Sequence, residues 1–148
     1  MPTHGRMVIA LAARLGLPLI IHCRDAASAA MDMLEQAGVK KAVLHCFAGT
    51  VEEARRARAL GYLIGIDAPV TYPNGGATRS AATVARADGI LVETDAPYLP
   101  PQSKRGGRNE PAFLVETLQT LAALFALPFD DLARITTATA LQFFDRMK

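Results

Sequence analysis

The sequence predicts an α/β protein built around a parallel β-sheet, and three observations support this fold class. A helix-like segment, a glycine and a short apolar strand follow one another four times, which is typical of repeated βα units. The strands are continuous apolar runs, as in parallel strands that are buried on both faces. The 148 residues are 51% hydrophobic and 20% charged, which suits one globular domain over 1–148 with its own core.

The first two units are expected to pair a helix at about 5–15 with a strand at 18–22, and a helix at about 26–37 with a strand at 42–45. Both helices are inferred from apolar residues at helical spacing. These residues are Val8, Leu11, Ala12 and Leu15 in the first helix, and Ala27, Met31 and Leu34 in the second. Each helix is followed by a glycine, where a left-handed residue closes the last turn. The glycines of the four units are Gly16, Gly38, Gly61 and Gly89.

The next two units place strands at 62–66 and 90–93. Thr50 and Glu53 have the spacing of a capping box, which predicts the start of the third helix. A loop rich in proline and glycine follows the third strand and leads to a weaker helix at about 78–87.

The repeat stops after the fourth strand. A long loop at 97–111 leads to a strongly amphipathic helix, with Asn109 as its expected cap and Pro111 in its first turn. The last segment, about 129–146, is expected to form one broken helix or two short ones. The apolar residues expected to point inward from these two segments are Leu114, Leu118, Leu121, Phe125, Leu132, Ile135, Leu141 and Phe144.

Four strands joined by right-handed helical crossovers can form an open doubly wound sheet or part of a (β/α)8 barrel. A complete barrel of that kind usually needs about 250 residues, so this chain is too short for one.

Charge and cysteine content limit the classes of function. A net charge of +2 permits a nucleic-acid substrate but does not predict one. Two cysteines do not make a disulfide framework. Because neither a signal peptide nor an apolar run of about 18 residues is present, we expect a cytoplasmic protein with no membrane segment.

Polar side chains that can bind metal ions stand at the C-terminal ends of three strands. They are His22, His45 and Asp95, and Asp95 lies two residues after Glu93. Reactive groups gather at this end of strands in parallel βα proteins. Since side chains alternate along a strand, His22 shares a face with Ile20 and Arg24, His45 with Val43 and Phe47, and Asp95 with Leu91 and Glu93. If these faces line a barrel, two imidazoles and a carboxylate converge, a set that suits a catalytic divalent cation.

Each of these residues also has a simpler structural explanation. Either histidine can be a core residue that is hydrogen-bonded to the backbone. Glu93 or Asp95 can form a salt bridge with Arg24, although Arg24 at the strand mouth also suits a phosphate oxygen. The basic loop at 104–109 suits a phosphate as well, but a solvated loop explains it more simply.

The pairs His22-Cys23 and His45-Cys46 also suggest a structural Cys2His2 zinc site. Strand geometry argues against it, because adjacent residues point to opposite faces and one ion cannot easily take both members of each pair. We therefore expect Cys23 and Cys46 to face the outer helices as reduced, small buried hydrophobes.

Five segments together resemble the TatD family of metal-dependent hydrolases. They are LPLIIHCRDA at 17–26, LHCFAG at 44–49, GYLIGIDAPVTY at 61–72, ETDAPYL at 93–99 and RNEP at 108–111. Their order and spacing agree with the family across nearly the whole chain.

The resemblance implies the C-terminal portion of a TIM-type (β/α)8 barrel of the amidohydrolase-like superfamily. It also implies a deoxyribonuclease or 3′-exonuclease that cleaves phosphodiester bonds of DNA. By this resemblance His22, His45 and Asp95 would bind divalent metal (Mg, Mn or Zn), and Asp95 would also be catalytic by helping to activate the attacking water. Arg24 is our expected substrate-binding residue.

The sequence departs from the family in one large way. The family's strand with a His-x-His pair and its bridging glutamate have no counterpart here, and Thr139 stands where the family usually has asparagine. We therefore expect a truncated domain whose exposed sheet edges promote self-association, with weak metal binding and little or no nuclease turnover. The alternatives are an amidohydrolase-group enzyme acting on a small ester or amide, or a non-catalytic remnant.

Overall fold

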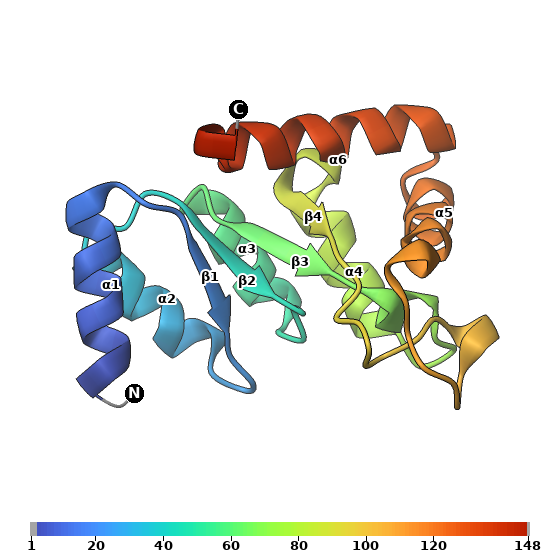
Figure 1. Ribbon diagram of the computed structural model, residues 1–148, viewed down its shortest axis with the longest axis horizontal. Coiled ribbons are helices and arrows are strands. Elements are labelled where there is room, and N and C mark those ends of the chain that lie inside the picture. Colours follow the sequence, from blue (N-terminus) through green and yellow to red (C-terminus); the bar gives the residue numbers. More distant parts are fainter. Residues whose placement is uncertain (1–2, 148) are drawn as a thin grey trace.

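A four-stranded parallel β-sheet organises the protein in the computed structural model, which describes residues 3–147 (Figure 1). The strands lie in sequence order, and each neighbouring pair is parallel, so the predicted fold class is confirmed. The strands are β1 (Leu19–His22), β2 (Ala42–His45), β3 (Leu63–Ile66) and β4 (Ile90–Val92).

Six α-helices surround the sheet, with α2, α3 and α4 behind it in the view of Figure 1. They are α1 (Thr3–Leu15), α2 (Ala27–Gln36), α3 (Val51–Ala59), α4 (Gly76–Ala85), α5 (Leu114–Phe125) and α6 (Phe129–Phe143). Short 3-10 turns are η1 (Ala68–Thr71), η2 (Ala87–Gly89), η3 (Gln102–Lys104), η4 (Pro111–Phe113) and η5 (Asp145–Met147). The predicted capping box is present, since Thr50 and Glu53 bond reciprocally at the start of α3.

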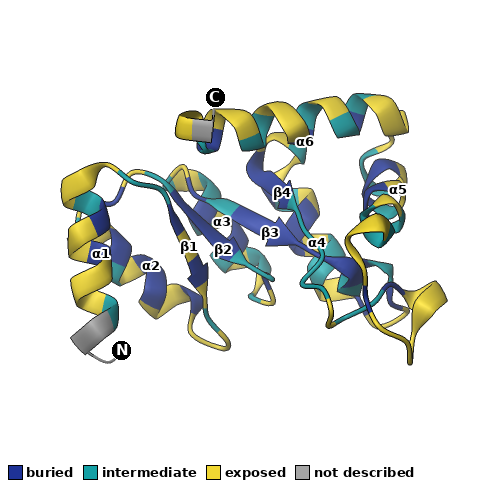
Figure 2. Cartoon of the chain, in the orientation of Figure 1, coloured by how far each residue is buried: buried dark blue, intermediate teal, exposed yellow. Residues whose placement is uncertain are grey.

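The main hydrophobic core lies between the helices and one face of the sheet, and most residues of β2, β3 and β4 are dark in Figure 2. Leu44, Ile64 and Ile90 point into it from the three strands β2, β3 and β4, and Met31 and Leu34 fill it from α2. All five side chains are fully buried, which explains why the core-facing positions of these short strands are apolar.

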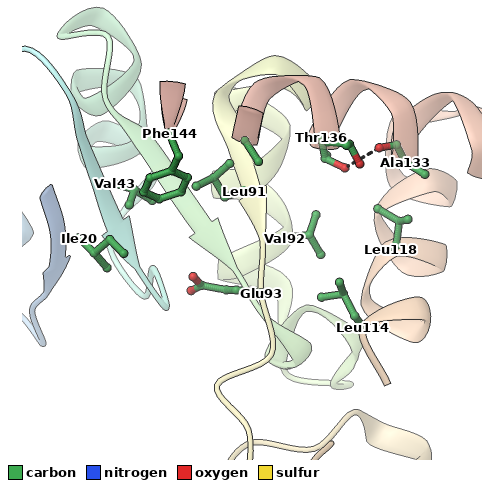
Figure 3. A pocket seen from close by; sticks show the side chains of 12 residues that line it. Ile20, Val43, Leu91, Val92, Glu93, Leu114, Leu118, Ala133, Thr136 and Phe144 are labelled. Atoms are coloured by element: carbon green, nitrogen blue, oxygen red, sulfur yellow. Dashed lines mark hydrogen bonds between the residues drawn. The ribbon is translucent and has the colours of Figure 1, made fainter. Parts of the chain in front are cut away.

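The opposite face of the sheet is only partly covered. Phe143 of α6 packs on Val43 and Leu91 in a second, smaller cluster, whereas Ile20 on β1 is 62% exposed. A groove of about 370 Å³ runs along this face and over β4 toward α5 and α6 (Figure 3). Within residues 3–147, β1 and β4 each pair with a single neighbour. The predicted open sheet edges are therefore present.

Helix α1 corrects one packing prediction. Ile9 and Ala12 are buried, but Val8, Leu11 and Leu15 are more than half exposed, so most of the predicted stripe faces away from the core. The physical reason is that α1 flanks an edge strand, and only one side of the helix has a partner to pack against.

The C-terminal part differs from expectation in three places. Asn109 does not cap α5, because its side chain turns back into the preceding loop, and a 3-10 turn beginning at Pro111 comes before the helix. Helix α6 is continuous rather than broken. Leu141 is 48% exposed instead of pointing inward.

Three of the four predicted glycine turns are confirmed. Gly16, Gly38 and Gly61 have positive φ, but at the fourth place Arg86 takes the positive φ and Gly89 is buried beside Arg58. Among residues 3–147, no single helix is long and apolar enough to span a membrane. The segments Pro111–Phe125 and Phe129–Phe143 reach that length and apolarity only when taken together, and the chain bends by 106° between them.

Candidate metal centre

The strand register places the two predicted histidines side by side. His22 and His45 are paired neighbours at the C-terminal ends of β1 and β2. Their ring centroids are 5.8 Å apart and their planes are inclined by 43°. His22 is exposed, whereas the side chain of His45 is mostly buried. The register thus brings both imidazoles to one edge of the sheet.

His45 lies between two carboxylates that follow β4. Its Nδ1 is 2.8 Å from Oε1 of Glu93, and its Nε2 is 3.4 Å from Oδ1 of Asp95. Burial alone lowers the pKa of His45, but the hydrogen bond to Glu93 and the negative charges of Glu93, Asp95 and Asp67 outweigh it, so the pKa is raised above its usual value.

The two contacts of His45 differ in kind. The 2.8 Å contact with Glu93 has the length of a hydrogen bond, and a carboxylate at this place favours the proton on Nδ1 and leaves Nε2 as a ligand atom. Two ligand atoms about 2.1 Å from one tetrahedral ion stand roughly 3.4 Å apart. The separation of 3.4 Å between His45 Nε2 and Asp95 Oδ1 therefore suits two ligands of one cation.

Glu93 reaches His45 only because the residue between them is a glycine. Gly65 on β3 lies between the strands that carry the two side chains, and a Cβ there would stand 2.6 Å from Cδ of Glu93. Such a contact is far inside van der Waals separation. The same Glu93 oxygen accepts a 2.6 Å hydrogen bond from the backbone N–H of Cys46. Figure 3 shows the Glu93 side chain extending from the end of β4 across the open face.

A second group of polar atoms gathers beside Asp95. One ligand atom each from Cys46, Asp67 and Asp95 lies within 4.8 Å of the others, and this is the compact three-residue group found among the described residues. Asp67 directly follows β3 and is 2% exposed. Its Oδ2 has no hydrogen-bond partner in the part of the chain that the structure describes. An orphaned buried carboxylate beside a thiol, an imidazole and a second carboxylate is a donor set that fits a divalent cation.

Burial also governs protonation in this group. The pKa of the Asp67 carboxyl is raised, mainly by burial and also by the charges of Glu93 and Asp95. The hydrogen bond from Cys46 lowers the pKa but does not outweigh these effects. Burial and the hydrogen bond to Asp67 together raise the pKa of the Cys46 thiol well above its ordinary range. A cation that takes the Cys46 sulfur must therefore displace a proton.

The orientation of Cys46 contradicts the sequence analysis. Cys46 was expected to face the outer helices and Phe47 the open face, but Phe47 is buried in the main core and Cys46 turns toward Asp67. The reason is the backbone: Cys46 has a φ of 47°, which breaks the alternation of the strand after His45. Asp95 has a φ of 51° in the corresponding position after β4. Cys23 packs against the main core as expected, and both thiols are free.

The basic residues expected to meet a substrate are accessible. Arg24 is exposed and forms no ion pair or hydrogen bond with other described residues, so the alternative of a salt bridge to Glu93 or Asp95 is not observed. In the basic loop, the Arg105 guanidinium lies 4.3 Å from the ring centroid of Tyr72.

Asp67 and Gly65 are the residues that sequence reasoning missed. Asp67 carries the same signal as His22 and His45, a polar residue at the C-terminal end of an apolar strand. Gly65 interrupts that strand, and a glycine inside a strand often marks a close approach of other atoms.

The chain is similar to known proteins over most of its length. The family model for TatD-related DNases matches residues 6–145. An uncharacterized metal-dependent hydrolase, YabD of Bacillus subtilis, is 35% identical over 141 residues, covering 94% of this chain and 55% of that protein. The 3′-5′ ssDNA/RNA exonuclease TatD of Erwinia tasmaniensis is 39% identical over 140 residues, covering 90% of this chain and 53% of that protein.

The fold agrees with that similarity. The crystal structure of YjjV, a TatD homolog from Escherichia coli K12, superposes with a TM-score of 0.87 at 30% identity. The match covers 93% of this chain and 53% of that one. The chain thus spans about half the length of the relatives it matches.

Proposed function

Because the chain belongs to the family of TatD-related DNases, we propose that it carries the metal-binding edge of a hydrolase that cleaves phosphodiester bonds of DNA. The observation that carries the proposal is the position of His45, whose ring is held by Glu93 on one side and faces Asp95 on the other. A related protein that acts as a 3′-5′ ssDNA/RNA exonuclease supports removal of nucleotides from a 3′ end.

The residues divide into ligands and a positioning group. His45 Nε2 and Asp95 Oδ1 would hold the cation, with the neighbouring His22 ring as the third protein ligand. When bound, a divalent ion (Mg, Mn or Zn) polarises a phosphodiester and lowers the pKa of a nearby water. Glu93 keeps the imidazole in one orientation, as carboxylates next to metal-binding histidines commonly do.

Asp95 and Arg24 supply the remaining chemistry. The Asp95 carboxylate would accept a hydrogen bond from the attacking water, which orients the water and removes its proton. Arg24 stands exposed two residues after His22, and its planar guanidinium suits a bidentate contact with phosphate oxygens. Arg24 would therefore anchor the phosphate next to the scissile bond.

We expect weak catalysis from the 148-residue chain alone. Three protein ligands suffice for one open metal site, so binding of a single ion requires no further residues. The open face and the two unpaired sheet edges leave this site without walls on one side, and a site open to water loses much of its electrostatic advantage.

The test compares two carboxylate-to-amide variants. The metal content of the purified chain is measured after dialysis against Zn²⁺, together with release of nucleotides from a 3′-labelled single strand with and without chelator. Asp95→Asn should lose the metal, whereas Asp88→Asn, which removes a surface carboxylate paired with Arg58, should retain it. Equal metal content in the two variants would refute the site. Faster hydrolysis of a small ester or amide than of DNA would favour the amidohydrolase alternative.

A further inference from the structure

We propose that Cys46, Asp67 and Asp95 form a second cation position, adjacent to the one at His45 and Asp95, with Asp95 shared between the two. The inference shares one residue with the proposed function and otherwise stands on different side chains. It would give this sheet edge two neighbouring cations without any ligand from outside the described residues.

The geometry needs little adjustment. The three ligand atoms lie within 4.8 Å of one another. Around one tetrahedral ion with sulfur and oxygen ligands, such atoms stand roughly 3.4–3.7 Å apart, so closure requires shifts of at most about 1.4 Å. Side-chain rotations of Cys46 and Asp95, both partly exposed, can supply movements of that size.

The second observation is the state of Asp67. Its side chain is 98% shielded from solvent, because the residue is only 2% exposed, and its Oδ2 has no hydrogen-bond partner among residues 3–147. None of the ion pairs in that part of the chain includes Asp67. Cys46 donates a hydrogen bond to this carboxyl, but a buried carboxylate oxygen that lacks any partner is still costly, and a cation at this place removes the cost.

The donor set selects the kind of cation. One sulfur and two carboxylate oxygens form a borderline-soft set, which Zn²⁺ and Co²⁺ accept and Mg²⁺ does not favour. Loading releases the proton of the Cys46 thiol, which otherwise bonds to Asp67. This position should thus fill with zinc or cobalt, whereas the position at His45 has no sulfur and also accepts manganese.

Cobalt is the probe, because thiolate ligation to Co²⁺ gives a near-ultraviolet charge-transfer band that imidazole and carboxylate ligation lack. The metal-free chain is titrated with Co²⁺ in a phosphine-reduced buffer without thiols. We expect the band to develop with one equivalent and the total uptake to reach two. Cys46→Ser should abolish the band and leave one cobalt bound, while the control Cys23→Ser, at the only other cysteine, should keep both.

Two further variants separate this position from the proposed function and from a structural role. His45→Ala should lose the cobalt at His45 but keep the thiolate band, so the two positions can fail independently. Asp67→Asn should lose the band, yet leave the metal-free melting temperature unchanged or higher, because it replaces a buried carboxylate that has one oxygen without a partner in residues 3–147. The proposal is overturned if no band forms, if Cys46→Ser keeps it, or if His45→Ala abolishes it. A marked drop in melting temperature for metal-free Asp67→Asn would instead assign Asp67 a structural role and also overturn the proposal.

Discussion

Replacing Gly65 by alanine should disconnect Glu93 from His45 without altering either side chain. A Cβ on Gly65 would lie 2.6 Å from Cδ and 2.7 Å from Oε2 of Glu93. Carbon and oxygen atoms that are not bonded keep roughly 3.4 Å or more between them, so the carboxylate must retreat by about 0.8 Å.

That displacement acts directly on the contact with His45. Glu93 Oε1 lies 2.8 Å from His45 Nδ1, and Oε1 is also the Glu93 atom that an added Cβ would crowd most, so the carboxylate must leave its present position against the imidazole. Loss of such a partner behind a metal-binding histidine commonly weakens metal affinity 10- to 100-fold, about 1.4–2.7 kcal/mol. Fold stability should not fall, since alanine suits a strand at least as well as glycine.

The assay is a Zn²⁺ competition titration against a chromophoric chelator, with melting temperature measured in parallel. Gly76→Ala is the matched control, because a Cβ at Gly76 at the start of α4 meets nothing within 4 Å. Glu93→Gln should weaken Zn²⁺ binding to a similar extent. The double variant with Gly65→Ala should be little weaker than either single one, because both changes remove the same bond.

Unchanged Zn²⁺ affinity in Gly65→Ala would refute this account of Glu93. Full additivity with Glu93→Gln would do the same, because it would mean that the two residues act on the metal by separate routes. A drop in melting temperature larger than that of Gly76→Ala would show that Gly65 serves packing of the strand.

Three other predictions address protonation, the loop and the sheet edges. In chelator, the melting temperature should fall as pH rises from about 6.5 through the raised pKa of His45, because the stabilising protonated imidazole is then lost; His45→Gln should flatten this dependence. Asn109→Ala should lower the free energy of unfolding by about 1–3 kcal/mol in urea titrations, since its buried amide donates to the carbonyls of Thr94, Tyr98 and Leu99. The chain should sediment as an oligomer at micromolar concentration, and Ile20→Lys on the open face should shift it toward monomer; a monomeric wild type would contradict the expected self-association.

The succession of helices and strands could be predicted because local signals agree with tertiary packing in most of this chain. Thr50 and Glu53 form the capping box that their spacing indicates, and the apolar run at 42–45 is a strand with those bounds. Prediction failed where burial depends on packing against another element. The apolar residues of α1 indicate that one side of the helix is buried, but only the position of α1 beside an edge strand determines that Ile9 is buried and Val8 is not.

The site could be predicted only in part, because alternation stops where the strands end. His22 and His45 were placed correctly at one edge, since both lie within regular strands. Cys46 was misplaced because a positive φ, for which cysteine gives no sequence signal, reverses its direction. Asp67 carries the signal of a polar residue after an apolar strand, but only the meeting of three strand ends in the fold brings it close to Cys46 and Asp95.

Three acidic side chains gather at this edge without a lysine or arginine partner among the described residues. Several other carboxylates do have one, in the pairs Lys41–Asp145, Arg56–Asp32, Arg56–Glu35, Arg58–Asp88 and Arg134–Asp131. Among basic side chains in residues 3–147, Glu93 and Asp95 instead pair only with His45, and Asp67 pairs with none. Three acidic side chains thus converge on one imidazole, and protonation of His45 can offset at most one negative charge. A divalent ion would supply positive charge at this edge. Without an ion, burial raises the pKa of Asp67 and favours its protonated form. Metal binding is therefore coupled to the release of a proton.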